Sequence, residues 1–266
     1  MKFYASDLNE IVASLAPPDL SCSWDNVGFQ IGKRHRIIRR VLCALEVTPP
    51  IIKEAGKRKV QALVVHHPLI FRPASSITDA TPSGRMILEL IRSDLCLIVA
   101  HTNLDKSPYG TNRALAKLLG LKNLSFLEPE SHPDYGMGYL GNLTREISLK
   151  SFVNSLKRKL NITHARVVGD PGTRVKNVAV VTGAGGDALR NPEISRADVL
   201  VTGEIGHHAA LDARITGPAV VCAGHFATEV VGMSYFAEVL ARREKIRKAG
   251  VEIMVAGEQF PPFETF

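Results

Sequence analysis

The stretch ALVVHHPLIF, residues 62–71, decides the fold and introduces the first candidate functional residues. Its apolar, strand-forming side chains end in two adjacent histidines, His66 and His67, and Pro68 follows. Neighbouring side chains on a continuing strand point to opposite faces, so the two imidazoles can share a site only where the chain leaves the sheet. Pro68 favours that departure, because it has no amide hydrogen and it disfavours a helical His67. Open α/β sheets bind their ligands at such carboxyl ends of buried strands.

Apolar strand patterns alternate with amphipathic helix patterns on both sides of this stretch. Strands are predicted at 37–46, 95–101, 164–169, 176–183, 197–203, 218–224 and 251–257, and helices at 84–93, 111–119, 149–160, 204–215 and 226–243. Residues 122–147 are expected to be irregular, and Thr48 before Pro49 is expected to start a further helix. This alternation predicts an α/β fold with largely parallel sheets flanked by helices.

The two halves of the chain echo each other. LCLIVAHTNLD at 95–105 and AVVCAGHFATE at 219–229 both consist of an apolar strand, a histidine, three further residues and a carboxylate. The echo predicts two similar α/β lobes related by an internal repeat, with the functional site in the cleft between them. The first lobe would cover residues 1–125 and could include the C-terminal segment, and the second would cover 126–266. The alternative is chance similarity among apolar strands.

Composition places the chain among globular proteins. Its 266 residues are 45% hydrophobic and 22% charged, which suits one large domain or two modest ones. No apolar run approaches the roughly 20 residues that span a bilayer. Acidic residues stand near the start, where a secretory signal needs an apolar core. We therefore expect a cytoplasmic protein with no membrane contact.

The net charge of +7 is concentrated in basic clusters at 33–40, 57–59, 157–159 and 242–248. Such clusters can attract anionic partners, from nucleotide phosphates to nucleic acid, although a single cluster is more often a solvated helix face or loop rim. The four cysteines show no C-x-x-C spacing, so a zinc finger is not expected.

Five imidazole and carboxylate groups stand at or just after predicted strand ends. Side chains of these types without thiolate suit Zn, Fe, Mn, Co or Ni. Five ligands exceed what one open catalytic ion needs but fit two divalent ions, which a carboxylate can bridge. The set is His66, His67, Asp105, His225 and Glu229.

Other residues carry two interpretations each. His101 and Glu204 could transfer protons, although an isolated histidine such as His101, His207 or His208 is more often structural. The glycine-rich loop TGAGGD, with Gly183 and Gly185, could approach a phosphate or could be only a tight turn. Trp24, in SWDNVGF, could line the cleft or anchor the core.

The ordered motifs SWDNVGFQIG, VVHHPLIF, AHTNLD, GAGGD, VTGEIGHH and AGHFATE resemble the Ngg-one-interacting factor three family (Nif3-like proteins), also known as GTP cyclohydrolase I type 2 homologues. The resemblance runs from residue 24 to about residue 240. It implies a pair of α/β lobes and a two-metal site at the five positions above, with Glu229 bridging the ions. It also implies a homohexamer whose metal sites face an internal cavity. Glu46 in CALEVT stands where the family usually has an aspartate.

Two functional hypotheses follow. The first is a metal-dependent hydrolase acting on a nucleotide-like or other phosphorylated heterocycle. In it, His101 or Glu204 moves a proton, and Trp24, Gly183 and Gly185 bind the substrate. The second is a regulatory protein with structural metals, whose basic surface binds a protein or nucleic-acid partner.

Overall fold

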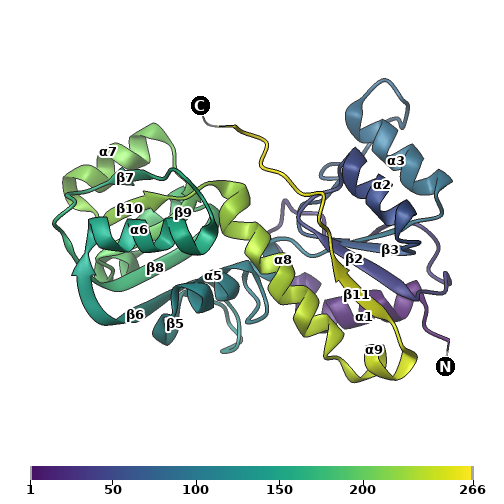
Figure 1. Ribbon diagram of the computed structural model, residues 1–266, viewed down its shortest axis with the longest axis horizontal. Helices are drawn as coiled ribbons and strands as arrows, with labels where there is room; N and C mark the ends of the chain where they lie inside the picture. Colours follow the sequence, from purple (N-terminus) through teal and green to yellow (C-terminus); the bar gives the residue numbers. More distant parts are fainter. Residues whose placement is uncertain (1, 265–266) are drawn as a thin grey trace. The chain divides into compact units, whose positions relative to one another are not determined.

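The computed structural model describes residues 2–264 and divides into two compact units, each with a sheet of its own. The first unit consists of the residues up to Leu104 together with Met233–Phe260. The second consists of Asp105–Gly232 and the C-terminal residues that begin at Pro261. Figure 1 shows that helices cover the sheet of each unit, so the α/β fold class predicted from the sequence, with sheets flanked by helices, is confirmed.

The first sheet has the strand order β1-β4-β3-β2-β11. Four of its strands run parallel, and only β1 runs antiparallel, against β4. Their registers align Ala44 of β2 with Val65 of β3, and Val65 with Val99 of β4. The residues that follow these three strands therefore emerge at one edge of the sheet. The strands are β1 Gly28–Ile31, β2 Arg40–Ala44, β3 Ala62–Val65, β4 Cys96–Val99 and β11 Glu252–Val255.

Both faces of the first sheet are covered. Figure 1 shows α2 and α3 on one face and α1 on the other. The strands that lie inside the sheet are buried along almost their whole length, as expected for parallel strands between helix layers. Thr48 starts α2 as predicted, because its hydroxyl accepts the Ile51 N–H at 3.4 Å. The helices are α1 Ala5–Leu15, η1 Pro18–Leu20, α2 Pro49–Lys57, α3 Pro82–Arg92 and the unpredicted α9 Glu244–Ala249.

The second sheet is mixed rather than largely parallel, which corrects the sequence-based expectation. Its order is β5-β6-β8-β9-β10-β7, and only the neighbouring pairs β8–β9 and β9–β10 are parallel. The antiparallel strands lie toward the two edges of the sheet. The strands are β5 Lys122–Pro129, β6 Gly136–Ser148, β7 Arg166–Val168, β8 Arg174–Ala184, β9 Val199–Glu204 and β10 Ala219–Cys222.

The prediction of an irregular stretch at 122–147 was wrong, because β5 and β6 pair as a long antiparallel hairpin there. Two glycines of this hairpin lie beneath side chains of the partner strand. A Cβ at Gly136 would come within 2.5 Å of the Phe126 ring, and a Cβ at Gly141 within 2.6 Å of Leu124. Glycine in this hairpin therefore marks close packing and not a turn.

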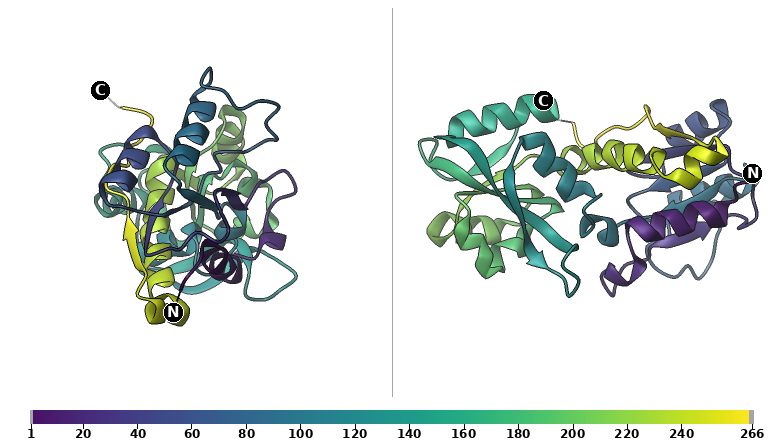
Figure 2. Two further views of the ribbon diagram at one scale, coloured as in Figure 1. Left: turned by 90° about the vertical axis from the view of Figure 1, so that its right-hand side faces the viewer. Right: turned by 90° about the horizontal axis from the view of Figure 1, so that it is seen from below.

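Helices flank the second sheet as well. Figure 2 shows α6 and α7 on opposite sides of it. The buried residues of α5 and α6 share one core cluster with the sheet, and Ala213 of α7 belongs to another. No described helix is both long enough and apolar enough to traverse a lipid bilayer. The helices within this unit are α5 Thr111–Leu119, α6 Leu149–Leu160, η2 Gly186–Arg190, η3 Pro192–Arg196 and α7 His207–Thr216. Two further helices, α4 Thr102–Asp105 and α8 His225–Ala241, each begin in one unit and end in the other.

Candidate metal centre

Three imidazole rings meet at the carboxyl edge of the first sheet. His66 and His67 follow β3, and His101 follows β4, whose last residues pair with those of β3. The ring centroid of His66 lies 5.1 Å from the ring centroid of His67 and 5.0 Å from that of His101. One ring nitrogen from each residue lies within 4.8 Å of the others, close enough for them to bind a common ion. The chain therefore does leave the sheet at the histidine pair, so that both rings serve one cluster.

Each of these rings is oriented by an acceptor bound to its Nδ1 atom. His66 Nδ1 donates to the Ala100 carbonyl at 2.9 Å, and His67 Nδ1 donates to Glu46 Oε1 at 3.1 Å. His101 Nδ1 donates to Asp25 Oδ1 at 2.8 Å. A carbonyl or carboxylate oxygen can only accept, so the proton belongs on Nδ1 and the lone pair on Nε2. In all three rings Nε2 therefore carries the lone pair that can bind a metal ion. Metal-binding histidines in proteins are oriented in the same way, by an acceptor bound to the other ring nitrogen.

Asp25 anchors the loop that precedes β1. Its side chain is fully buried, and Thr102 donates to Oδ2 from its N–H at 3.1 Å and from its hydroxyl at 2.6 Å. Burial raises the pKa of Asp25, but the hydrogen bonds from His101 and Thr102 and the nearby imidazole outweigh it and lower the pKa to about 2. Asp25 therefore stays ionised and holds the Nδ1 proton on His101.

The second unit carries a histidine–carboxylate pair where β10 leads into α8. His225 and Glu229 are four residues apart at the helix start, and His225 Nε2 lies 3.1 Å from Glu229 Oε2. His225 Nδ1 donates to Glu204 Oε1, also at 3.1 Å, from the end of the neighbouring strand β9. Glu204 therefore orients His225 in the way that Glu46 orients His67.

Asp105 belongs to a buried polar network in the second unit. Thr111 donates a short hydrogen bond to Asp105 Oδ1 and lies 2.7 Å from the hydroxyl of Thr182. Asn112 donates to the Asp105 carbonyl at 3.0 Å and accepts the Thr182 N–H at 2.7 Å. The network connects the carboxylate of Asp105 to the end of β8, one residue before Gly183.

Gly183 packs directly against the histidine–carboxylate pair. Its φ is +66°, and a Cβ added there would overlap Glu229 Oε1 and lie 3.2 Å from His225 Nε2. Its N–H donates to the hydroxyl of Thr228 at 3.1 Å. Gly183 therefore provides the space that the Glu229 carboxylate occupies. The substrate-binding role suggested for Gly183 and Gly185 stays a prediction.

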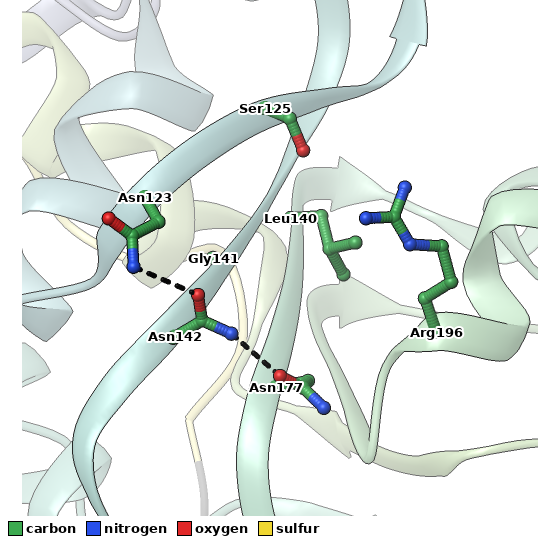
Figure 3. Close-up of a pocket in the computed structure, with 7 residues that line it drawn as sticks. All are labelled: Asn123, Ser125, Leu140, Gly141, Asn142, Asn177 and Arg196. Atoms are coloured by element: carbon green, nitrogen blue, oxygen red, sulfur yellow. Dashed lines mark hydrogen bonds between the residues drawn. The ribbon is translucent and has the colours of Figure 1, made fainter.

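Two hollows of the second unit differ in chemistry. The larger, of about 1100 Å³, is lined by Glu204 and His225 and also by Arg166 and Phe226. The smaller, of about 300 Å³, lies over a ladder in which Asn123 donates to Asn142 and Asn142 to Asn177 (Figure 3). The smaller pocket is lined by no histidine, cysteine or carboxylate. Only the larger hollow therefore adjoins candidate metal ligands.

The donor chemistry of both units fits divalent transition-metal ions. Imidazole Nε2 atoms with acceptors on Nδ1, next to carboxylates, are the ligands that Zn, Fe, Mn, Co and Ni accept. Sequence reasoning identified the histidines and carboxylates but missed Asp25 and the orienting role of Glu46. No short spacing links them to their histidines, which lie 76 and 21 residues away along the chain.

Comparison with known proteins agrees with the motifs. A relative from Clostridium perfringens, named GTP cyclohydrolase 1 type 2 homolog, is 32% identical, and the alignment covers 97% of this chain and 98% of the relative. A relative of the same name from Clostridium acetobutylicum is 29% identical, with 99% of each chain covered. These names describe the relatives.

Solved structures match over the whole chain. A Staphylococcus aureus protein known as hypothetical protein SA1388 matches with a TM-score of 0.95 at 29% identity, and all of both chains is covered. Reduced HcgD from Methanocaldococcus jannaschii matches with a TM-score of 0.77 at 29% identity, covering 97% of this chain and 99% of that one. The sequence model of the Duf34/NIF3 (NGG1p interacting factor 3) family matches residues 3–261. The chain therefore belongs to the Duf34/NIF3 family.

Proposed function

We propose that this chain binds two divalent transition-metal ions and is a hydrolase for a nucleotide-like or other phosphorylated heterocycle. The proposed ligands are His66 and His67 from the first unit, with Asp105, His225 and a bridging Glu229 from the second. The names of the curated relatives support the substrate class, because they refer to a GTP cyclohydrolase.

One observation carries this proposal: an acceptor binds Nδ1 of every histidine in the ligand set. The acceptors are Ala100 O, Glu46 and Glu204, and each leaves the lone pair on Nε2. A core histidine needs only one satisfied hydrogen bond, whereas several imidazoles oriented alike and next to carboxylates have the character of metal ligands.

Each group in the proposed site has its own role. Bound divalent ions would supply Lewis acidity and would bring the pKa of a bound water toward neutrality. Glu46 and Glu204 keep the rings of His67 and His225 in their orientation. Asp25 is ionised near neutral pH and accepts the Nδ1 proton of His101, so that His101 Nε2 is available for proton transfer or for metal binding.

Three further elements belong to the proposal. The internal repeat is supported by the parallel neighbours β2-β3-β4 in one sheet and β8-β9-β10 in the other, in the same order along the chain. We also infer a cytoplasmic location and a homohexamer, the latter by family resemblance alone. Analytical ultracentrifugation of the purified protein tests the hexamer directly.

The decisive experiment combines elemental analysis with a hydrolysis assay. Gently purified protein should contain close to two transition-metal ions per chain, and a chelator should abolish hydrolysis of a nucleotide from a GTP, ATP and UTP panel. His66→Ala and Glu229→Gln should each lose metal and reduce turnover by at least about a hundredfold, because each removes a ligand.

Matched controls separate ligand loss from general damage. His132→Ala removes an exposed histidine, and Glu238→Gln removes an exposed carboxylate on the same helix as Glu229. Both controls should keep metal and turnover. Protein without stoichiometric metal, or full turnover in His66→Ala, would contradict the hydrolase.

The alternative, a nucleic-acid-binding regulator, gains no support from three basic side chains of the 33–40 cluster, which form ion pairs. In the 33–40 cluster, Lys33 and Arg36 both lie 3.1 Å from Asp94, and Arg40 lies 3.1 Å from Glu252. Neutralised side chains contribute little to phosphate binding. The alternative would be supported if the protein bound RNA or DNA with an affinity that falls steeply as the salt concentration rises.

A further inference from the structure

Next to the three imidazoles of the first unit, two aromatic side chains and one arginine form a row. We propose that this row, Trp24, Phe71 and Arg72, is a binding platform for a planar heteroaromatic ring that carries phosphate. The inference rests on the proposed function and deepens it, because it assigns the part of the protein that recognises the substrate.

The row begins at the candidate metal ligands. The indole ring of Trp24 packs edge-on against His101, with ring centroids 6.2 Å apart, and the Phe71 ring lies 5.8 Å from the indole. The guanidinium of Arg72 follows, 6.0 Å from the centroid of Phe71. The two aromatic rings, tilted at 57° to each other, therefore link the imidazoles to the guanidinium through successive contacts.

The side chains of the row are exposed although two of them are large and apolar. Trp24 is 59% exposed and Phe71 is 40% exposed. Exposed aromatic pairs provide stacking surfaces, and stacking of a base on an aromatic ring is worth about 1–3 kcal/mol. Among residues 2–264, no carboxylate lies within ion-pair distance of the Arg72 guanidinium, so its charge is available to an anionic ligand.

A clamp of amide side chains builds the platform. Gln30 on β1 accepts the Ile70 N–H at 3.0 Å and donates to the Ile70 carbonyl at 3.0 Å. Asn26 donates to that same carbonyl at 2.5 Å. The peptide groups on both sides of Ile70 are thereby held against the loop that carries Trp24.

The loop that carries Trp24 is also held in place by hydrogen bonds. Asp25, the residue after Trp24, is buried and accepts hydrogen bonds from Thr102 and His101. Amide and carboxylate hydrogen bonds therefore hold both loops that carry the row in place. Such preorganisation reduces the entropy that ligand binding costs.

Trp24 also provides the test, because it is the only tryptophan of the chain. Nucleotides (GTP, ATP and UTP), guanosine and inorganic triphosphate are titrated into the metal-loaded protein while Trp24 fluorescence is recorded. At least one nucleotide should quench the emission saturably. Guanosine should bind at least about tenfold more weakly than GTP, because it lacks the charge that Arg72 recognises. Triphosphate should compete without quenching.

Substitutions identify the contribution of each side chain. Arg72→Ala should weaken nucleotide binding about tenfold and leave guanosine binding unchanged, while Arg92→Ala, at an exposed position of α3, should change neither. Phe71→Ala should weaken nucleotides and guanosine alike. Trp24→Ala should weaken the binding of nucleotides and of guanosine further. Its binding is measured by calorimetry, because the variant has no tryptophan fluorescence.

Several results would overturn the platform. The inference fails if no nucleotide quenches Trp24, or if Arg72→Ala and Phe71→Ala bind nucleotides like the unaltered protein. It also fails if Trp24→Ala only changes the sedimenting mass, which would make the patch a contact between copies of the chain.

Metal analysis keeps this failure distinct from failure of the proposed function. Protein that contains metal and hydrolyses nucleotides without any effect of Phe71 or Arg72 refutes the platform alone. Protein that binds nucleotides through Arg72 but contains no metal refutes the hydrolase alone.

Discussion

At the level of single residues, orientation of imidazole rings is the recurring feature of this protein. His67, His101 and His225 donate from Nδ1 to a carboxylate, and His66 donates to a carbonyl. A carboxylate also raises the basicity of the ring that it orients. Glu46, one carbon longer than the aspartate expected from family resemblance, still reaches His67.

Replacement of Glu46 tests the orienting role. Glu46→Ala should lower the affinity for metal about 10- to 100-fold, because His67 loses the acceptor that fixes its ring. Glu46→Gln keeps an acceptor oxygen, so its affinity for metal should fall by a smaller factor. Metal affinity measured with a competing chelator distinguishes the variants, and Glu89→Ala, at an exposed position, serves as the control. Equal affinities for all of these variants would exclude the role.

Gly183 is the second residue with a specific prediction. Gly183→Ala should cost about 2–3 kcal/mol of unfolding free energy, because alanine at positive φ is strained and its methyl would displace Glu229. Metal content should fall as well. Gly186→Ala adds a methyl where no atom lies within 4 Å, so it should change stability by less than about 1 kcal/mol. Urea unfolding measures the free energy of unfolding of both variants. If Gly183→Ala is as stable as Gly186→Ala, the close packing of Gly183 against Glu229 is contradicted.

At the level of elements, one carboxylate attaches the end of β11 to α2. Glu54 on α2 is buried and accepts the N–H groups of Gly257 and Glu258, each at 3.0 Å to Oε2. Arg58, one turn later, donates to Oε1 at 2.7 Å. Burial raises the pKa of Glu54, but these hydrogen bonds and the charge of Arg58 outweigh it and lower the pKa below 4.5.

The lowered pKa of Glu54 makes this attachment pH-dependent. Its contribution is fully present above pH 4.5, the pKa expected for the unfolded chain, and is lost as the pH falls through the lower folded-state pKa. Glu54→Gln should therefore destabilise the protein by about 1–3 kcal/mol at pH 6 and by less at pH 3.5. Denaturation midpoints at both pH values, with Glu10→Gln as the exposed control, measure the difference. A difference independent of pH would refute the assignment.

Elements were predictable from the sequence where their local signals agreed with their packing. The helices at 111–119 and 149–160 were predicted with the observed bounds, since each combines an apolar stripe with a left-handed residue at its end, Gly120 or Asn161. The hairpin of β5 and β6 was missed because its glycines are required by partner side chains, which no local pattern reveals.

At the level of the whole molecule, the proposed ligand set draws on both units, and thermal unfolding tests this. Removal of metal by a chelator should lower Tm by roughly 5–10 °C, since ligand at 100 times its Kd stabilises by about 2.7 kcal/mol. His67→Ala in the first unit and Glu229→Gln in the second should each abolish the chelator effect. If only one of them does, the proposed centre does not draw on both units.

The sequence by itself determined the alternation of strands and helices, the family and the residues that carry the candidate chemistry, because periodicity and motifs are local properties. The tertiary structure alone decided which acceptors orient the histidines, since Asp25 and Glu46 meet His101 and His67 only after separate strands align. It also decided the mixed second sheet and the exposed row beside His101. These depend on contacts between segments far apart in the chain, where no local pattern of residues carries the information.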